Sequence, residues 1–402
     1  MQSDRPQLDP SFSLYLDLVR FIAALLVVLT HCRQYGLIGG WQAHLIPYAG
    51  RESVIVFFVL SGFVIAYSTL SKQVSLRDYF AARLTRIGSV AVPAVLIAFA
   101  CAVLIDRLYG PGLAPSYVLK KAYIYVPLHL LFMGDAWGIS EVPPWLYPYW
   151  SLNYEVWYYV LFGVLHYLHG VRKAVAGTLV LAIVGYKLWL LMPIWAAGVW
   201  LYKWVDRHTM STTVARYGWL ASTLLLVAYN LSDLQQQLRM AAVSLWPYPH
   251  LPLGSAERVL ADYLVCVLVV ANFACARYAA FTKLDRFAIV IRRVAFFTFP
   301  LYLTHALVLG IWRAFHPHQT GALPDVVLVT IIVVMLTWLL GHGAERLRVS
   351  ALKSIAAMPK QRHAAREGSK APGILSVAKQ ADFPHPFPPT QTEVPRSPTG
   401  KL

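Results

Sequence analysis

Residues 16–31 read LDLVRFIAALLVVLTH, an apolar run that holds Arg20 near one end and His31 at the other. The two residues are eleven positions apart, which in an α-helix is about 16 Å of rise and only about 20° of rotation. Both side chains therefore lie on one stripe of a helix. A charged group inside a membrane helix is costly and usually faces a bundle interior or a water-filled cavity. The run predicts one wall of a polar passage through a membrane.

The composition of the whole chain is that of a polytopic membrane protein. Only 13% of its 402 residues are charged and 58% are hydrophobic, whereas a soluble domain carries about 25% charged residues. The sequence predicts an all-α membrane protein with about ten transmembrane helices around a central polar cavity. The predicted spans are 14–32, 54–70, 88–106, 151–168, 174–191, 193–204, 217–231, 259–276, 295–314 and 325–343.

The basic residues are concentrated in alternate loops, and this pattern predicts the orientation of the chain. If the N-terminus is inside, the inner loops hold most of the Lys and Arg, so the positive-inside rule favours two cytoplasmic termini. Short basic loops attract anionic membrane lipids, which explains the net charge of +16 without a nucleic-acid partner. The predicted parts are a cytoplasmic segment at 1–13, an integral-membrane domain at 14–345 and a disordered, proline-rich cytoplasmic tail at 346–402.

Further charged residues lie where membrane helices rarely carry them. Arg83 and Arg86, in RLTR, are three positions apart and share a helix face. Two guanidinium groups together bind phosphate bidentately, although this pair also fits ordinary positive-inside charge. Glu155, in WSLNYE, is expected to orient His31, to act as a base or to hold an arginine. The alternative for Glu155 is a helix-terminus carboxylate stabilised by the helix dipole.

Aromatic residues and a second histidine mark candidate substrate contacts. His305 and Tyr302 lie one turn apart in FPLYLTHALVL, inside a late span. A histidine in that position is a candidate site residue, unless a neighbouring helix satisfies it. The long outer loop before residue 151 is rich in aromatic residues and proline and ends at Trp150. Such a surface suits stacking on sugar rings and also suits anchoring at the membrane interface.

These residues are compatible with more than one function. Arg20 can bind an anionic group and His31 can act as a general base, because histidine titrates near neutrality. Alternatively, Arg20 forms a structural ion pair with Asp17, and His31 is simply hydrogen-bonded. The sequence has no zinc-type spacing, Walker loop, dinucleotide fingerprint or Gly-x-Ser-x-Gly motif, so it predicts no metal and no permanently bound cofactor. Intramembrane charges are also typical of secondary transporters, and an exporter of a sugar or lipid-linked glycan is the alternative function.

Five stretches resemble, in the same order, motifs of the acyltransferase-3 membrane family. LDLVRFIAALLVVLTH resembles its Arg-x10-His helix, FFVLSGFVI its second helix, RLTR its Arg-x-x-Arg motif, WSLNYE its Trp-Ser-Leu-x-x-Glu element and LYLTH its Leu-Tyr-Leu-x-His element. The resemblance covers residues 14–345. The chain departs from the family at Ile55 and Val156, where relatives usually have acidic residues, and we expect no fused esterase-like domain.

The resemblance implies a membrane O-acyltransferase of the bacterial cytoplasmic (inner) membrane. Such an enzyme moves an acyl group, most often acetyl, from cytoplasmic acyl-CoA to a hydroxyl of an extracytoplasmic or lipid-linked carbohydrate. By resemblance, Arg20, His31 and Glu155 are catalytic, and Arg83 and Arg86 bind the acyl-CoA, with acetyl-CoA as a donor substrate. His31 would take the proton of the acceptor hydroxyl, with Glu155 holding its tautomer. Direct attack on the thioester and an acyl-His31 intermediate both remain open.

Tyr302, His305 and Trp150 complete the predicted site as substrate-binding residues. Tyr302 and His305 belong to the LYLTH element, and Trp150 comes directly before the Ser-Leu-x-x-Glu part of WSLNYE. All three therefore lie in or beside motifs that carry the resemblance. The expected partners are the acyl-CoA, the carbohydrate or glycolipid acceptor and the membrane lipids.

Overall fold

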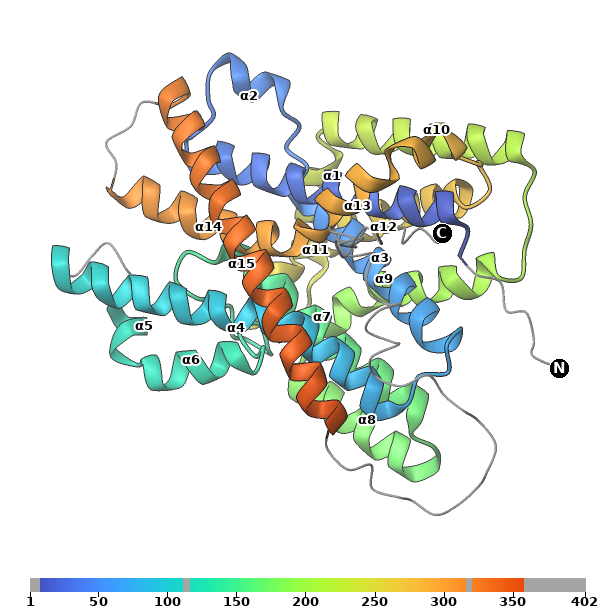
Figure 1. Ribbon diagram of the computed structural model, residues 1–402, viewed down its shortest axis with the longest axis horizontal. Coiled ribbons are helices and arrows are strands. Elements are labelled where there is room, and N and C mark those ends of the chain that lie inside the picture. Colours follow the sequence, from blue (N-terminus) through green and yellow to red (C-terminus); the bar gives the residue numbers. More distant parts are fainter. Residues whose placement is uncertain (1–7, 111–115, 316–319, 358–402) are drawn as a thin grey trace, which may run out of the picture.

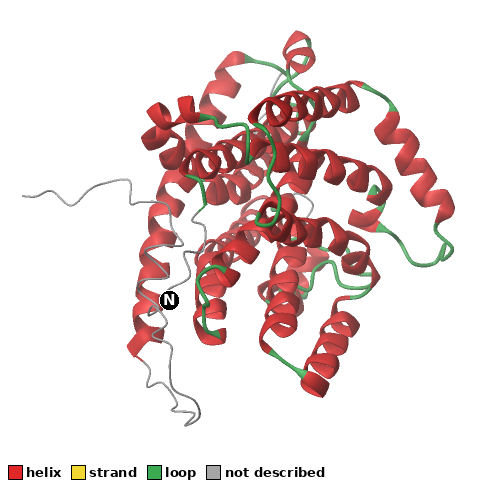
Figure 2. Cartoon of the chain, turned by 90° about the vertical axis from the view of Figure 1, so that its right-hand side faces the viewer, coloured by secondary structure: helices red, strands yellow, loops and turns green. Residues whose placement is uncertain are grey.

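The computed structural model describes residues 8–110, 116–315 and 320–357, and over these ranges its regular elements are helices (Figure 1). The longer helices are α1 (Pro10–Gln34), α3 (Gly50–Leu70), α4 (Leu76–Tyr109), α7 (Trp150–Tyr167), α8 (Gly170–Val184), α9 (Tyr186–Val205), α10 (Thr212–Leu231), α12 (Val259–Ala276), α14 (Thr298–Phe315) and α15 (Leu323–Ala357). The shorter α-helices are α2 (Trp41–Leu45), α5 (Ser116–Lys120), α6 (Ala122–Leu130), α11 (Leu234–Leu245) and α13 (Ala288–Phe296). Three 3-10 helices are η1 (Tyr147–Tyr149), η2 (Gly254–Ala256) and η3 (Thr282–Phe287). Figure 2 shows the same all-helical architecture from the side.

Each of the ten predicted spans overlaps one of these longer helices. Within the described residues, six helices are long and apolar enough to cross a membrane, and a bent pair, Thr282–Phe296 with Thr298–Phe315, raises the number to seven. The helices α7, α8 and α10 are not among those six. The structure therefore confirms an all-helical protein with several membrane-spanning helices, and the number of about ten stays a prediction.

One predicted helix boundary is wrong. The sequence predicted separate spans at 174–191 and 193–204, but α9 runs through this point with Pro193 inside it. The chain breaks instead at Gly185, whose φ of 82° lies in the left-handed region. Glycine adopts that conformation without steric cost and commonly ends helices. A Cβ on Gly185 would also lie 2.7 Å from the ring of Trp137, so the position requires glycine for space as well.

The helices α3 and α9 pack backbone against backbone. A Cβ on Gly62 would lie 2.1 Å from the carbonyl oxygen of Trp195, and a Cβ on Gly198 would lie 2.0 Å from that of Val59. Small residues allow membrane helices to approach this closely. The stretch FFVLSGFVI thus fixes α3 against α9 through Gly62, which leaves the neighbouring Ser61 free to face another side of the helix.

The helix α15 extends past residue 345, where the sequence predicted the disordered tail to begin. It continues as one helix to Ala357, past the predicted boundary at 345, and crosses the bundle diagonally in Figure 1. Ala344, Arg348 and Leu352 are buried and lie on one face, since residues four apart are neighbours on a helix. The first part of the predicted tail is therefore packed helix. Residues 358–402, and residues 1–7 of the predicted N-terminal segment, lie outside the described residues.

The helices α1 and α14 lie side by side and run in the same direction. Near its start, α1 contacts η3, where the Ser11 hydroxyl donates a hydrogen bond of 3.2 Å to Asp285. Near its end, the Gln34 carbonyl accepts a bond of 3.1 Å from Arg313. Between these points His31 contacts His305. The stripe of Arg20 and His31 therefore runs beside α14, and this pairing positions the candidate site.

Candidate active site

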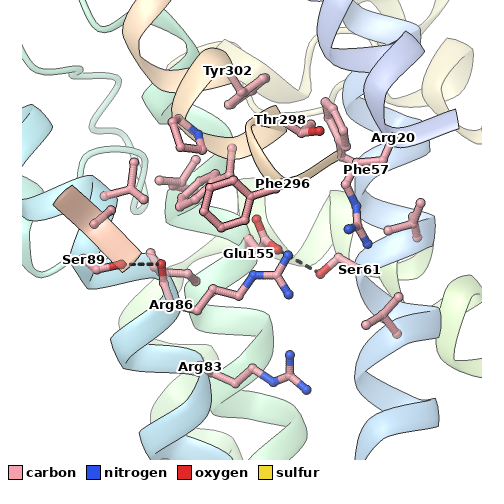
Figure 3. Close-up of a pocket in the computed structure, with 18 of the residues that line it drawn as sticks. Arg20, Phe57, Ser61, Arg83, Arg86, Ser89, Glu155, Phe296, Thr298 and Tyr302 are labelled. Carbon is pink, nitrogen blue, oxygen red and sulfur yellow. Dashed lines mark hydrogen bonds between the residues drawn. The ribbon is translucent and has the colours of Figure 1, made fainter. Parts of the chain in front are cut away.

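A pocket opens among α1, α3, α4, α7, α13, α14 and α15 (Figure 3). It offers about 190 Å³ to the centres of water-sized molecules. A single buried water needs only about 10–15 Å³ on that measure, so the pocket has room for a ligand-sized group. The charged and hydroxyl-bearing residues that line it are Arg20, Ser61, Arg83, Arg86, Ser89, Ser151, Glu155, Tyr159, Thr298, Tyr302, Glu345 and Arg348.

Three arginines predicted from the sequence meet in this pocket. Arg83 and Arg86 enter from the N-terminal part of α4, and Arg20 enters from the middle of α1. Arg83 is buried and donates a hydrogen bond from its guanidinium to the hydroxyl of Ser68. Arg20 is also buried, and its guanidinium lies 3.5 Å from the carboxylate of Asp17. The predicted Asp17–Arg20 pair therefore exists, but it does not remove Arg20 from the pocket.

Glu155 faces the arginines. Its Oε1 accepts a hydrogen bond of 3.0 Å from the Ser61 hydroxyl and a second one from the Tyr159 hydroxyl. Trp195 in turn donates to the Ser61 oxygen over 3.2 Å. Figure 3 shows Glu155 and Ser61 joined across the pocket, with the guanidinium of Arg86 directed toward them. Glu155 is thus a fixed pocket carboxylate. The hydrogen bonds that set its position come from Ser61 and Tyr159.

Tyr302 closes the end of the pocket farthest from Arg83 in Figure 3. Its hydroxyl lies 2.8 Å from that of Ser151 and donates a bond of 3.2 Å to the Pro148 carbonyl. The ring of Phe57 packs edge-on against it, with 5.5 Å between ring centroids. The motifs WSLNYE and LYLTH, far apart in the sequence, therefore meet at this hydrogen bond.

The two histidines form a pair just beyond Tyr302. His31 Nδ1 lies 2.8 Å from His305 Nε2, and His305 Nδ1 lies 2.8 Å from the Leu301 carbonyl oxygen. Both rings are buried, and His305 is fully so. The centroids of the Tyr302 and His305 rings are 6.4 Å apart. The sequence did not predict this pairing, since it offered Glu155 as the group that orients His31.

Trp150 and Tyr147 lie at the same end of the molecule in different surroundings. The guanidinium of Arg51 covers one face of the Trp150 ring at 4.5 Å and is itself bonded to Asp262. That face of Trp150 is therefore closed to a substrate. Tyr147 is 56% exposed, and its ring meets that of His31 edge-on at 5.9 Å. Tyr147 is thus an exposed aromatic residue in contact with the histidine pair, and it was not among the site residues predicted from the sequence.

Arg348 and Glu345 were also missed as pocket residues. They lie one turn apart on α15, with a hydrogen bond of 3.0 Å from Arg348 Nε to Glu345 Oε2, and both line the pocket. The sequence places Arg348 in the predicted tail at 346–402. The available signal was an acidic and a basic residue three positions apart, directly after an apolar run.

The comparison with protein families decides the class. The family described as an acyltransferase domain matches residues 13–342 of the chain, which includes every motif discussed above. The chain belongs to the acyltransferase-3 family. No curated protein and no solved structure matches it.

Membership of the acyltransferase-3 family confirms the resemblance noted in the sequence. Together with the apolar helices, it identifies an integral membrane protein with an acyltransferase domain. In this acyltransferase the first-helix motif is divided between two places, because Arg20 lines the pocket and His31 joins the histidine pair. Arg83, Arg86 and Glu155 share the pocket with Arg20, and Tyr302 connects the pocket to the histidines.

Proposed function

We propose that this protein is a membrane O-acyltransferase that transfers an acyl group, most often acetyl, from cytoplasmic acyl-CoA to a hydroxyl of an extracytoplasmic or lipid-linked carbohydrate. One observation carries the proposal. A pocket lined by four arginines ends at Tyr302, and Tyr302 contacts one of two paired histidines. The arrangement provides an anion-binding region and a neighbouring proton acceptor, which a transfer from a phosphorylated donor requires.

The arginine region suits the phosphates of the donor. Arg20, Arg83, Arg86 and Arg348 outnumber the two glutamates of the lining, Glu155 and Glu345. Arginine binds phosphate with two parallel hydrogen bonds and keeps its charge in any protein environment. In this proposal, Arg83, Arg86 and Arg348 hold the CoA phosphates at the cytoplasmic end. The pantetheine arm then runs past Arg20 toward Tyr302.

The transfer itself uses His31 as a general base. His31 takes the proton of the acceptor hydroxyl, and the oxygen attacks the carbonyl carbon of the thioester. A C–O bond forms, the C–S bond breaks, and the proton passes from His31 to the sulfur, so that CoA leaves as the thiol. General-base catalysis of this kind contributes about 10²–10⁴-fold to a rate. An acyl-His31 intermediate would give the same net reaction.

The acceptor reaches His31 past Tyr147 in this proposal. Tyr147 is the exposed ring in contact with His31, and an aromatic face suits the apolar face of a sugar. Trp150 has a smaller part in binding the acceptor than Tyr147, because Arg51 covers one face of its ring. The predicted inner-membrane location with cytoplasmic termini agrees with a donor that enters from the Arg83 end and an acceptor that enters from the Tyr147 end.

The test uses purified full-length protein in lipid nanodiscs. Binding of acetyl-CoA is measured by calorimetry, and transfer of radiolabelled acetyl groups to a bacterial glycan extract is measured in the same samples. We expect binding and transfer by the wild type, binding without transfer by His31→Ala, and weakened binding by Arg83→Ala. Arg239→Ala is the matched control, because Arg239 pairs with Glu257 on an exposed surface.

Two results would overturn the proposal. One is full transfer activity in His31→Ala. The other is the absence of acetyl-CoA binding by the wild type together with sugar movement that does not depend on Arg83 and Arg86, which would instead indicate the secondary transporter.

A further inference from the structure

The hydrogen bonds around the two histidines fix where their protons are. A carbonyl oxygen only accepts hydrogen bonds. His305 Nδ1, which lies 2.8 Å from the Leu301 oxygen, must therefore carry a proton. In a neutral imidazole the other nitrogen is then an acceptor, so His305 Nε2 accepts from His31 Nδ1 over 2.8 Å. It follows that His31 is protonated at Nδ1 and that its Nε2 carries the lone pair.

We infer that His305 is a positioning residue which, anchored on the Leu301 carbonyl, holds His31 in the one tautomer whose Nε2 can remove the proton of the acceptor hydroxyl. The inference rests on the proposed function and deepens it, because it names the reacting atom of His31. It also assigns His305 to the support of the base, whereas the sequence had suggested contact with the substrate.

Among the described neighbours of His31, only His305 forms a side-chain hydrogen bond that can fix the tautomer of His31. Glu155, the carboxylate first expected to orient His31, is bonded to Ser61 and Tyr159 in the pocket. The rings of Tyr35 and Tyr147 meet His31 edge-on at centroid distances of 6.5 and 5.9 Å. These are ring contacts, and they do not select a tautomer. The hydrogen bond to His305 does select one.

A neutral partner also suits the buried position of the pair. His31 is 7% exposed and His305 is fully buried, and a permanent charge among apolar helices is expensive. In the resting state neither ring needs a charge. When His31 Nε2 takes the hydroxyl proton, the bond from His31 Nδ1 to His305 becomes charge-assisted, and such bonds are about twice as strong as neutral ones. His305 therefore stabilises the charged His31 imidazolium during the reaction and adds no charge to the pair in the resting state. The proton then leaves with the CoA sulfur, and both rings return to their starting state.

Two substitutions of similar size distinguish positioning from packing. His305→Gln puts an amide oxygen near the place of Nε2 and keeps an acceptor for His31, whereas His305→Leu fills the space without an acceptor. We expect kcat to fall by about 10²-fold in His305→Leu, since a catalytic histidine in the wrong tautomer loses two or more orders of magnitude. His305→Gln should stay within about tenfold of the wild type, because the accepting hydrogen bond is retained. The KM for acetyl-CoA should change by less than about twofold in both, because neither variant touches the arginines.

A purely structural role predicts the opposite order, since a buried leucine packs better than a buried glutamine. Activity of His305→Leu equal to or above that of His305→Gln would therefore overturn the inference. A direct readout is nitrogen NMR of histidine-labelled wild type in lipid, with the His31 signals identified by their loss in His31→Ala. We expect protonated Nδ1 and unprotonated Nε2, and the reverse tautomer would overturn the inference even if His305→Leu fails to fold.

The same set of variants separates this inference from the proposed function. If His31→Ala keeps full activity, the base is wrongly assigned and the proposed function fails. If His31→Ala is inactive and His305→Leu is as active as the wild type, only the role of His305 fails.

Discussion

Arg20 and His31 lie at the two ends of one stripe on α1, and their polar side chains have opposite surroundings inside this membrane protein. At Arg20, the side chain opens into a pocket that it shares with three further arginines and two glutamates. At His31, the side chain is hydrogen-bonded to His305 and packed against the rings of Tyr35 and Tyr147. The first end lies in a pocket with charged walls, and the second end is buried and tightly packed.

The difference supports the proposal that donor binding and proton transfer take place at separate points along one helix. Like charges gathered in a low-dielectric region repel each other unless an anion joins them, which supports the proposal that the arginine end holds the phosphates of the donor. A general base must be unprotonated to act, and the inferred hydrogen bond from His31 Nδ1 to His305 leaves His31 Nε2 unprotonated.

The largest effect is expected from His31→Ala. Loss of the base should lower kcat by about 10²–10⁴-fold, while the Kd for acetyl-CoA changes by less than about twofold. The measurement is radiolabelled acetyl transfer beside calorimetric binding in nanodiscs. A tenfold rise in Kd would show that the two ends of α1 do not act separately.

Arg83→Ala and Arg86→Ala should have the reverse pattern. Each removes a charged donor to phosphate, worth about 1.5–3 kcal/mol, so the Kd for acetyl-CoA should rise by about 10- to 100-fold. At saturating donor, kcat should fall by less than about threefold. Arg86→Lys is the matched variant, and it should bind with intermediate affinity because lysine keeps the charge without the bidentate geometry. A fall in kcat with an unchanged Kd would contradict this prediction, because it would show that these arginines act in the chemical step and not in donor binding.

Arg348→Ala should weaken donor binding less than Arg83→Ala does. Its guanidinium is already bonded to Glu345, so part of its charge is compensated before any ligand arrives. We expect a rise in Kd of about three- to tenfold, which corresponds to a net hydrogen-bond contribution of about 1 kcal/mol. Arg346→Ala, which changes a neighbouring residue outside the pocket lining, is the control and should bind as the wild type does.

Tyr302→Phe tests the residue that lies between the arginine pocket and the histidine pair. The variant keeps the ring against Phe57 and His305 but loses the hydrogen bond to Ser151 and the longer one to the Pro148 carbonyl, which still accepts from Ser151. A single hydrogen bond contributes about 0.5–1.5 kcal/mol, so kcat/KM should fall by about two- to tenfold with unchanged binding of free CoA. Ser151→Ala should have a similar effect, and the double variant should lose little more than either single one. Fully additive losses would contradict a shared hydrogen bond.

Arg239→Ala should have the smallest effect. Arg239 and Glu257 form an exposed pair, and exposed ion pairs contribute about 0.2–1 kcal/mol. Donor binding and kcat should both stay within experimental error of the wild type, and thermal unfolding should shift by a few degrees at most. A clear loss of activity in Arg239→Ala would show that the reaction also depends on residues away from the stripe on α1.

The sequence alone determined the features that depend on neighbouring residues. Apolar runs predicted the helices, because a membrane helix buries all of its sides and needs about 20 apolar residues in a row. The spacing of Arg20 and His31, and that of Arg83 and Arg86, placed each pair on one helix face, because the period of a helix is fixed. The order of five motifs was sufficient to indicate the family.

The tertiary structure decided which faces meet. His31 and His305 are 274 positions apart, and no local period connects them. Glu155 lies opposite the arginines, and Arg348 joins them from a helix that was predicted to have ended. Many packings of the same helices satisfy the same apolar patterns. The contact between α3 and α9 through Gly62, and the parallel course of α1 and α14, select one of them, and in that packing the arginine pocket and the histidine pair occupy separate places.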